Sequence, residues 1–303
     1  MAEGRPRAAQ AAKLPLRHAL LLGLVQGPTE VLPISSSAHI SLLPCLAGWS
    51  HAEEDAELRN SLEVALHTGT AAALTFALRG ELEQALRELD GKALASAALA
   101  LAPPALVGYL MEQRLECRPS GPRALAAGLA AGAAAMVWAD TRPQTRGRAD
   151  LGTCDGLALG LAQALALLPG VSRNGATLTA ARARSFARED AQALSWRAGL
   201  PVIAGAAVLK GFRLRQSRVT LAFDRFGRHS LRSHSRIDQH PRFGQRGAPP
   251  GAVPALVVGT GAAFLSTLAC APLIRPGRRA RALWPFALYR VGLALGTVAS
   301  SGS

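Results

Sequence analysis

Long stretches without a charged residue recur along the chain and predict helices long enough to cross a lipid bilayer. The run from Ala93 to Met111 holds nineteen uncharged residues and the run from Gly247 to Ile274 holds twenty-eight, whereas a spanning helix needs roughly 20. Shorter uncharged runs cover Val64–Leu78, Ala124–Ala139 and Gly156–Ser172. The pattern predicts an all-α, polytopic integral membrane protein that forms one membrane domain over residues 1–303.

Composition leaves one alternative fold class, a soluble bundle of alanine-rich helices. Mean hydropathy is only +0.18, because alanine replaces leucine in many runs and arginine fills the gaps between them. The hydrophobic parts of the chain nevertheless contain Pro103, Pro104, Pro201 and Pro254. Proline inside a helix is tolerated better in membrane bundles than in soluble ones, so the prolines favour a membrane protein.

A net charge of +14 raises the question of nucleic-acid binding, but the position of the charge argues against it. Residues 210–246 carry one Lys and nine Arg against two Asp and show no helical periodicity. This predicts a disordered, cytoplasmic loop over residues 213–249, with anionic lipid headgroups as its contact. No nucleic-acid-binding module surrounds the loop, so we expect membrane lipids and no nucleic acid as partners.

Two similar segments lie 137 residues apart in the chain. "GLVQ" at Gly23–Gln26 recurs as "GLAQ" at Gly160–Gln163, and each copy runs on to a proline, Pro33 or Pro169, and a polar cluster. Duplicated, interrupted hydrophobic segments are typical of inverted-repeat membrane folds, in which broken helices meet near the middle of the bilayer. We therefore predict two re-entrant helix hairpins, one in a first repeat half over 14–140 and one in a second half over 151–300, which loop 213–249 interrupts.

The polar residues at the two breaks are chemically complementary. The first break offers a carboxylate, hydroxyls and an imidazole, and the second offers a guanidinium with further hydrogen-bond donors. Such a pair suits a substrate that contains phosphate, because the planar guanidinium binds two phosphate oxygens at once. The residues are Glu30, Ser35, Ser36, Ser37 and His39 at the first break and Ser172, Arg173, Asn174 and Thr177 at the second.

Spacing within the first break suggests roles for its residues. Ser36 and His39 lie three residues apart, so on a helix the imidazole could take the hydroxyl proton or position a water. Glu30 could orient His39, act as a base, or bind a divalent cation with Gln26, four residues earlier on the same helix face. The sequence leaves these alternatives open.

Two further polar residues have a structural interpretation. We expect His67, in "EVALHTGT", to be a packed or hydrogen-bonded histidine rather than a ligand. We expect Arg290, in "FALYR", to extend its side chain to the membrane surface.

Three motifs carry a resemblance to a known family. "QGPTEVLPISSSAH" at 26–39, "PGVSRNGAT" at 169–177 and "FALYR" at 286–290 resemble the signatures of the bacterial undecaprenyl-diphosphate phosphatase family, also called the bacitracin-resistance protein family. The resemblance covers residues 14–210 and 252–299. It implies a multi-pass enzyme of the bacterial plasma membrane that hydrolyses undecaprenyl diphosphate to undecaprenyl phosphate and inorganic phosphate. The product is the lipid carrier for peptidoglycan synthesis, and the family's activity depends on a divalent cation, Mg or Ca.

The resemblance also assigns expected roles to individual residues. Catalytic residues are expected at Glu30, Ser36, His39 and Arg173, and metal ligands at Gln26 and Glu30. Substrate-binding residues are expected at Ser35, Ser172, Arg173, Asn174 and Thr177.

The chain departs from the family pattern at three motif positions. Gln26 stands where some members have Glu, Ala38 replaces the usual Gly, and Asn174 replaces the usual second Ser. Loop 213–249 resembles nothing in the family. Several alternatives stay open: a serine nucleophile or an activated water, a polyprenyl-phosphate carrier without hydrolysis, the orientation of the site in the membrane, and assembly into a homo-oligomer.

Overall fold

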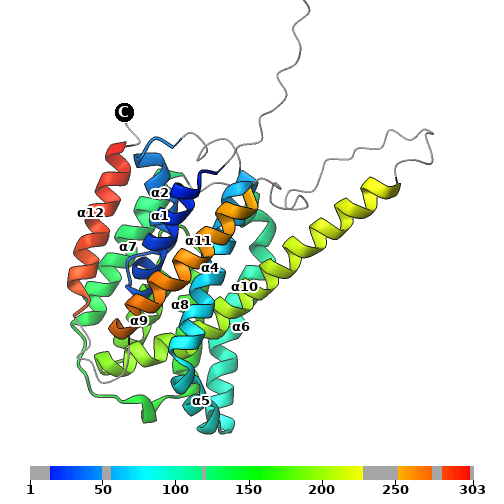
Figure 1. Cartoon of the computed structure of the whole chain (residues 1–303). Coiled ribbons are helices and arrows are strands. Elements are labelled where there is room, and N and C mark those ends of the chain that lie inside the picture. Colours follow the sequence, from blue (N-terminus) through cyan, green and yellow to red (C-terminus); the bar gives the residue numbers. More distant parts are fainter. Residues whose placement is uncertain (1–13, 50–55, 118–120, 228–251, 275–281, 301–303) are drawn as a thin grey trace, which may run out of the picture.

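A computed structural model describes residues 14–49, 56–117, 121–227, 252–274 and 282–300. Within these ranges the chain is helical apart from turns and one isolated β-bridge between Arg146 and Phe186. Figure 1 shows the helices packed into one bundle, from which the long helix α10 extends. The predicted all-α fold class is therefore confirmed.

The described residues form α-helices and two short 3₁₀ helices. In chain order they are α1 (Leu16–Val31), α2 (Ser36–Leu46), α4 (Ala56–Ala77), α5 (Arg79–Arg87), α6 (Gly91–Cys117), α7 (Pro122–Asp140), η1 (Arg148–Asp150), α8 (Thr153–Leu165), α9 (Arg173–Ala183), α10 (Arg188–Gly227), α11 (Val253–Cys270), η3 (Ala271–Leu273) and α12 (Trp284–Ser300).

Three helical stretches are long and apolar enough to cross a membrane: Gly91–Met111, Pro122–Asp140 and Val253–Leu273. The first two contain the uncharged runs Ala93–Met111 and Ala124–Ala139, and the third lies within the longest run, Gly247–Ile274. The shorter uncharged runs fall within α4 and in the segment that begins with α8, and those helices do not meet the same criterion of length and hydropathy. The apolar stretches agree with a membrane protein.

The helices that precede the two breaks, α1 and α8, each pack along a helix from the other half of the chain. Helix α1 packs along α11, which also packs on α4, while α8 packs along α6. Helix α7 packs along α12, and Figure 1 shows these two at one edge of the bundle. Helices α1 and α8 begin 137 residues apart, at Leu16 and Thr153, and α2 and α9 have the same separation and the same length of 11 residues.

Two glycines explain why the paired helices approach closely. A Cβ added to Gly23 in α1 would lie 2.6 Å from the carbonyl oxygen of Gly259 in α11. A Cβ added to Gly160 in α8 would collide with the backbone of α6 at Leu99. Small residues let helix backbones come together in a membrane, where packing contacts replace the hydrophobic effect. The repeated glycine of "GLVQ" and "GLAQ" thus has the same packing function in both copies.

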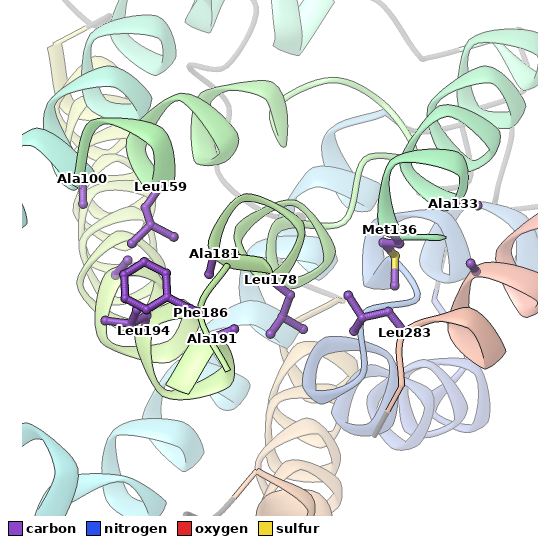
Figure 2. Packing of buried hydrophobic residues seen from close by; sticks show 12 residues of the cluster. Ala100, Ala133, Met136, Leu159, Leu178, Ala181, Phe186, Ala191, Leu194 and Leu283 are labelled. Carbon is purple, nitrogen blue, oxygen red and sulfur yellow. The ribbon is translucent and has the colours of Figure 1, made fainter. Parts of the chain in front are cut away.

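The largest cluster of buried apolar side chains joins several helices. Figure 2 shows Leu159 and Leu194 near Phe186 on one side, and Leu283 beside Met136 on the other. Phe186 comes from the connection between α9 and α10, so the cluster fixes α9 against its neighbours. This packing supports the start of α9, where the second polar cluster lies.

A buried ion cluster fixes the start of α8. Asp155, in the first turn, accepts two hydrogen bonds from Arg146, at 2.9 and 2.7 Å, and one from Arg184. Burial opposes ionisation, but the bonds from Arg146 and Arg184 outweigh it and lower the pKa of Asp155 to about 2. The carboxylate therefore stays charged and ties the connection before α8 to the end of α9.

The predicted loop 213–249 needs a correction. Helix α10 continues to Gly227, so residues 213–227 are helical. Val219, Ala222, Phe223 and Phe226 stand at the i, i+3, i+4 and i+7 spacing of a helix and the stretch has no proline, so its sequence is compatible with a helix despite the dense arginines. Residues 228–249 lie outside the described residues.

Candidate active site

The first polar cluster forms where α1 ends and α2 begins. Glu30 lies in the last turn of α1, and the chain turns back through Leu32–Ser35 so that Ser36 is the first residue of α2. Ser35 adopts a left-handed backbone with φ of 75°, a costly conformation for serine. The turn brings the Ser36 hydroxyl to Glu30, where it donates a 2.6 Å hydrogen bond to Oε2.

The second cluster forms at the corresponding break between α8 and α9. Gly170 has a φ of 79°, and Ser172 caps α9 by accepting a hydrogen bond from the Gly175 amide. Arg173 is therefore the first residue of α9, and its Nη2 donates to Oε1 of Glu30 at 3.1 Å. Glu30, Ser36 and Arg173, predicted from two distant motifs, meet in one group.

Helix α10 supports the Arg173 side chain from behind. The guanidinium carbon lies 5.2 Å from the centre of the Trp196 ring, within the range of a cation–π contact. Gly199 leaves the space that Nη1 occupies, because an added Cβ would overlap that nitrogen. Nη1 itself has no hydrogen-bond partner among the described residues, so one donor of the fork is uncommitted.

Asn174 connects the two breaks through the backbone. Its Nδ2 donates a 2.9 Å hydrogen bond to the carbonyl oxygen of Val31, the residue that follows Glu30. Its Oδ1 accepts a 2.9 Å bond from Ser195, and the Ser195 hydroxyl also pairs with that of Thr177. All three side chains are buried. The structure thus places two predicted substrate-binding residues, Asn174 and Thr177, in internal hydrogen bonds beside the ion pair.

Ser35 and Ser172 also make internal contacts. The Ser35 hydroxyl lies 3.3 Å from that of Ser37, and Ser172 is engaged as the cap of α9. Both residues are buried. Among the five predicted substrate-binding residues, Arg173 is the one with a buried side-chain atom that has no hydrogen-bond partner among the described residues.

His39 does not pair with Ser36 as the spacing suggested. Its Nδ1 lies 2.7 Å from the carbonyl oxygen of Ser35, and its Nε2 lies 2.7 Å from the hydroxyl of Tyr289 in α12. Because a carbonyl can only accept, Nδ1 carries the hydrogen and Nε2 accepts from Tyr289. The imidazole holds the strained turn against α12, and the group in contact with the Ser36 hydroxyl is Glu30.

Two residues from the sequence analysis surround the carboxylate of Glu30. His67 in α4 was expected to have a structural role, yet its Nε2 lies 3.8 Å from Glu30 Oε2, at the site. Gln26 is fully buried one turn before Glu30, and neither of its amide atoms has a hydrogen-bond partner among the described residues. The described residues contain no group of three or more His, Cys, Asp or Glu side chains that could hold a metal ion.

The expectation for Arg290 was wrong. Its side chain is 1% exposed and donates to the carbonyl oxygens of Pro33 and Gly170, one in each break, at 3.5 and 3.1 Å. It also donates to the carbonyls of Gly128 and Leu129 in α7. A guanidinium with several fixed donors can satisfy such a set of acceptors, whereas a membrane anchor would leave them unpaired. Arg290 is a bridge between the two breaks.

The fold and the polar cluster define a class, a helical membrane protein with an acid, a hydroxyl and a guanidinium gathered at two helix breaks. The chain belongs to the bacitracin resistance protein BacA family, whose profile matches residues 19–296. A relative in Trichlorobacter lovleyi, an undecaprenyl-diphosphatase, is 32% identical over 302 residues, covering 95% of this chain and 97% of the relative.

Shorter matches show higher identity. The undecaprenyl-diphosphatase of Geobacter metallireducens is 41% identical over 206 residues, which cover 64% of this chain and 74% of the relative. That of Pelotomaculum thermopropionicum is 36% identical over 214 residues, covering 68% of this chain and 79% of the relative.

Proposed function

We propose that the protein is a membrane phosphatase that hydrolyses undecaprenyl diphosphate to undecaprenyl phosphate and inorganic phosphate. The observation that carries the proposal is the contact of Ser36 and Arg173 with the two oxygens of Glu30. The names of the relatives agree with this reaction. The enzyme would recycle the lipid carrier of peptidoglycan synthesis in the bacterial plasma membrane and so contribute to bacitracin resistance.

The same proposal includes two re-entrant hairpins, α1–α2 and α8–α9, related by an inverted repeat. Their support is the common separation of 137 residues and the equivalent packing of Gly23 on α11 and of Gly160 on α6. Broken helices that meet inside a bilayer leave unpaired backbone groups, which are tolerated where they line a polar site.

In the proposed reaction, Arg173 binds the terminal phosphate of the diphosphate. In the described structure its Nη2 is neutralised by Glu30, and the phosphate oxygens can compete for the same fork. Arg173 also begins α9, so the positive end of the helix dipole favours an anion there. These groups stabilise charge on the phosphoryl group in flight, the main requirement of phosphoryl transfer.

Ser36 is suited to act as the nucleophile, with Glu30 as its base. As the Ser36 oxygen bonds to the terminal phosphorus, its proton passes to Glu30 Oε2, 2.6 Å away. The bond from that phosphorus to the bridging oxygen breaks, and undecaprenyl phosphate leaves. Glu30 gives that proton to the departing undecaprenyl phosphate and is a carboxylate again. Water then attacks the phosphorus of the phosphoserine and loses a proton to Glu30, and the bond to the Ser36 oxygen breaks as Ser36 regains that proton and inorganic phosphate leaves. His39 keeps the turn in place through Ser35 and Tyr289.

A divalent cation, Mg or Ca, is part of the proposal. Glu30 and Gln26 lie one helical turn apart and would supply oxygen ligands, and the Gln26 amide has no hydrogen-bond partner among the described residues. Mg²⁺ is often bound by one or two carboxylates together with substrate phosphates, so a small set of protein ligands fits. When bound, such an ion would neutralise part of the diphosphate charge.

The test is phosphate release from undecaprenyl diphosphate by the purified full chain in detergent, with and without Mg²⁺ or Ca²⁺. Arg173→Lys should lower turnover at least about 100-fold, because a point charge cannot replace the fork. Arg79→Lys, at an exposed position, is the matched control and should keep activity. Near-normal turnover of Arg173→Lys would remove Arg173 from this role.

A second measurement separates the two chemical routes. Rapid acid quench should trap phosphate on Ser36, and Ser36→Ala should trap none and lose turnover. Full activity of Ser36→Ala would instead assign the attack to a water. Transfer of lipid phosphate across proteoliposomes without phosphate release would favour a carrier.

A further inference from the structure

The orientation of His67 leaves one ring nitrogen directed toward the acid of the site. Nδ1 lies 2.8 Å from the backbone carbonyl of Glu63, which can only accept a hydrogen bond. Nδ1 therefore carries a hydrogen, which leaves Nε2 as the ring nitrogen that can take up either a proton or a metal ion. Nε2 lies 3.8 Å from Oε2 of Glu30. The His67 side chain is 29% exposed, whereas that of Glu30 is 8% exposed.

Two acceptors that face each other in a buried setting repel unless a cation lies between them. The positive charge of Arg173 contacts the other oxygen, Oε1. Gln26 adds another acceptor one turn before Glu30, and its fully buried amide has no partner among the described residues. The imidazole nitrogen of His67 and the carboxylate of Glu30 thus face each other between α4 and α1, and the Gln26 amide lies one helical turn before Glu30 on α1.

We propose that His67 Nε2 is a protein ligand of a divalent cation shared with Glu30 and Gln26, an inference that rests on the proposed function. Metal ions bind imidazole nitrogen and carboxylate oxygen at about 2.0–2.2 Å, so two ligands of one ion can lie no more than about 4.2 Å apart. The separation of 3.8 Å meets this limit. Diphosphate oxygens would supply further ligands.

The proposed ligand set makes a prediction about metal preference. Imidazole nitrogen is a ligand of first-row transition-metal ions, among which Mn²⁺ binds most weakly, whereas Ca²⁺ and Mg²⁺ take oxygen ligands. The site of this chain should therefore bind Mn²⁺ more tightly than Ca²⁺. His67→Gln replaces the nitrogen by an amide oxygen, so it should weaken Mn²⁺ binding while changing Ca²⁺ binding less.

The experiment uses Mn²⁺ alone and then Mn²⁺ with inorganic pyrophosphate on the full chain in detergent. Electron paramagnetic resonance counts bound Mn²⁺, and electron spin echo modulation detects a coordinated ¹⁴N nucleus. We expect nitrogen coupling in the wild type and in His18→Gln, the control histidine variant. His67→Gln should lose the coupling and weaken Mn²⁺ binding at least about tenfold. Thermal melting checks that each variant is folded.

Two results would overturn the inference: no nitrogen coupling in the wild type, or equal coupling and Mn²⁺ affinity in His67→Gln. Either result would mean that Nε2 of His67 carries a proton, and that His67 forms an ion pair with Glu30 in place of binding a metal ion. Phosphate release from undecaprenyl diphosphate is measured with Mg²⁺ on the same preparation. Release without nitrogen coupling rejects only the His67 ligand, whereas nitrogen coupling without release rejects only the phosphatase.

Discussion

Asn174 should determine how accurately Arg173 and Glu30 face each other. Its amide joins the carbonyl of Val31, next to Glu30, to the start of α9, next to Arg173, through a buried 2.9 Å hydrogen bond. Asn174→Ala removes this bond and the one from Ser195. At about 1 kcal/mol for each bond, and more for a buried acceptor left unpaired, the loss is about 2–4 kcal/mol. For a chain of this size that lowers the melting temperature by roughly 3–6 °C.

Asn174→Asp should be more damaging, although it has the same shape. The substitution replaces the Nδ2 donor by a carboxylate oxygen, which repels the carbonyl oxygen of Val31. We expect this repulsion to move the start of α9 away from the end of α1 and so to separate Arg173 from Glu30. A displacement of about 1 Å at a reacting group costs on the order of 100-fold in rate. We expect kcat for phosphate release to fall by that amount, with a smaller change in KM because Arg173 remains present.

The measurements are differential scanning fluorimetry and phosphate release in detergent. Asn60→Asp, at an exposed position of α4, is the matched control and should resemble the wild type. The reasoning is refuted if Asn174→Asp keeps the wild-type melting temperature and kcat. A lower melting temperature with unchanged kcat would show that Asn174 is structural but does not position the ion pair.

Three other predictions concern residues outside the reacting group. Arg290→Lys should leave several carbonyls unpaired and cost about 3–5 kcal/mol, seen as a large drop in melting temperature that exposed Arg79→Lys does not share. Gly160→Val should separate α8 from α6 and reduce the yield of folded protein in size-exclusion chromatography, whereas Gly292→Val, with open space at its Cβ, should not. Because the folded pKa of Asp155 lies below the unfolded value of 3.8, its stabilisation is present above that value and is lost as pH falls toward 2. Asp155→Asn should therefore cost about 1–2 kcal/mol at neutral pH, after screening by water, and the difference in melting temperature should shrink on acidification.

The uncharged runs predicted helices well because that signal is local. Ala93–Met111 lies within α6, Ala124–Ala139 lies within α7, and α11 lies inside the longest run. Proline and glycine near residues 33 and 169 likewise indicated where α1 and α8 end, since both residues act on their own backbone. Loop 213–249 was predicted wrongly in its first part because the dense arginines obscured the helical spacing of Val219, Ala222, Phe223 and Phe226.

The candidate site was only partly predictable because its contacts join distant parts of the chain. Chemistry at the two breaks suggested Glu30, Ser36 and Arg173, and the structure brings these three together. Spacing suggested His39 as the partner of Ser36, but a distance of three residues does not reveal that Tyr289, 250 positions away, binds its second nitrogen. Spacing alone did not indicate that Glu30, six residues earlier, reaches Ser36 through the turn.

Burial explains the error for Arg290, whereas His67 makes the predicted hydrogen bond, to the Glu63 carbonyl, and also lies beside the site. Aromatic residues before an arginine in "FALYR" are typical of a membrane interface, and the acceptors of Arg290 lie 120 to 257 positions away. His67 is close to its site through the packing of α4 on α1. In both cases the useful signal was a polar residue inside an apolar helix, which needs a partner even when the sequence does not identify it.

The bridge made by Arg290 has a consequence for the order of assembly during synthesis. The ribosome makes the two breaks long before it reaches residue 290, and chains begin to fold from the N-terminus as they emerge. Until α12 is in place, the carbonyls of Pro33 and Gly170 lack their shared donor. A nascent chain can therefore contain Glu30, Ser36 and Arg173 and still lack Arg290, whose hydrogen bonds connect the two breaks. The two breaks are therefore joined through Arg290 only after α12 has been made and packed into the bundle.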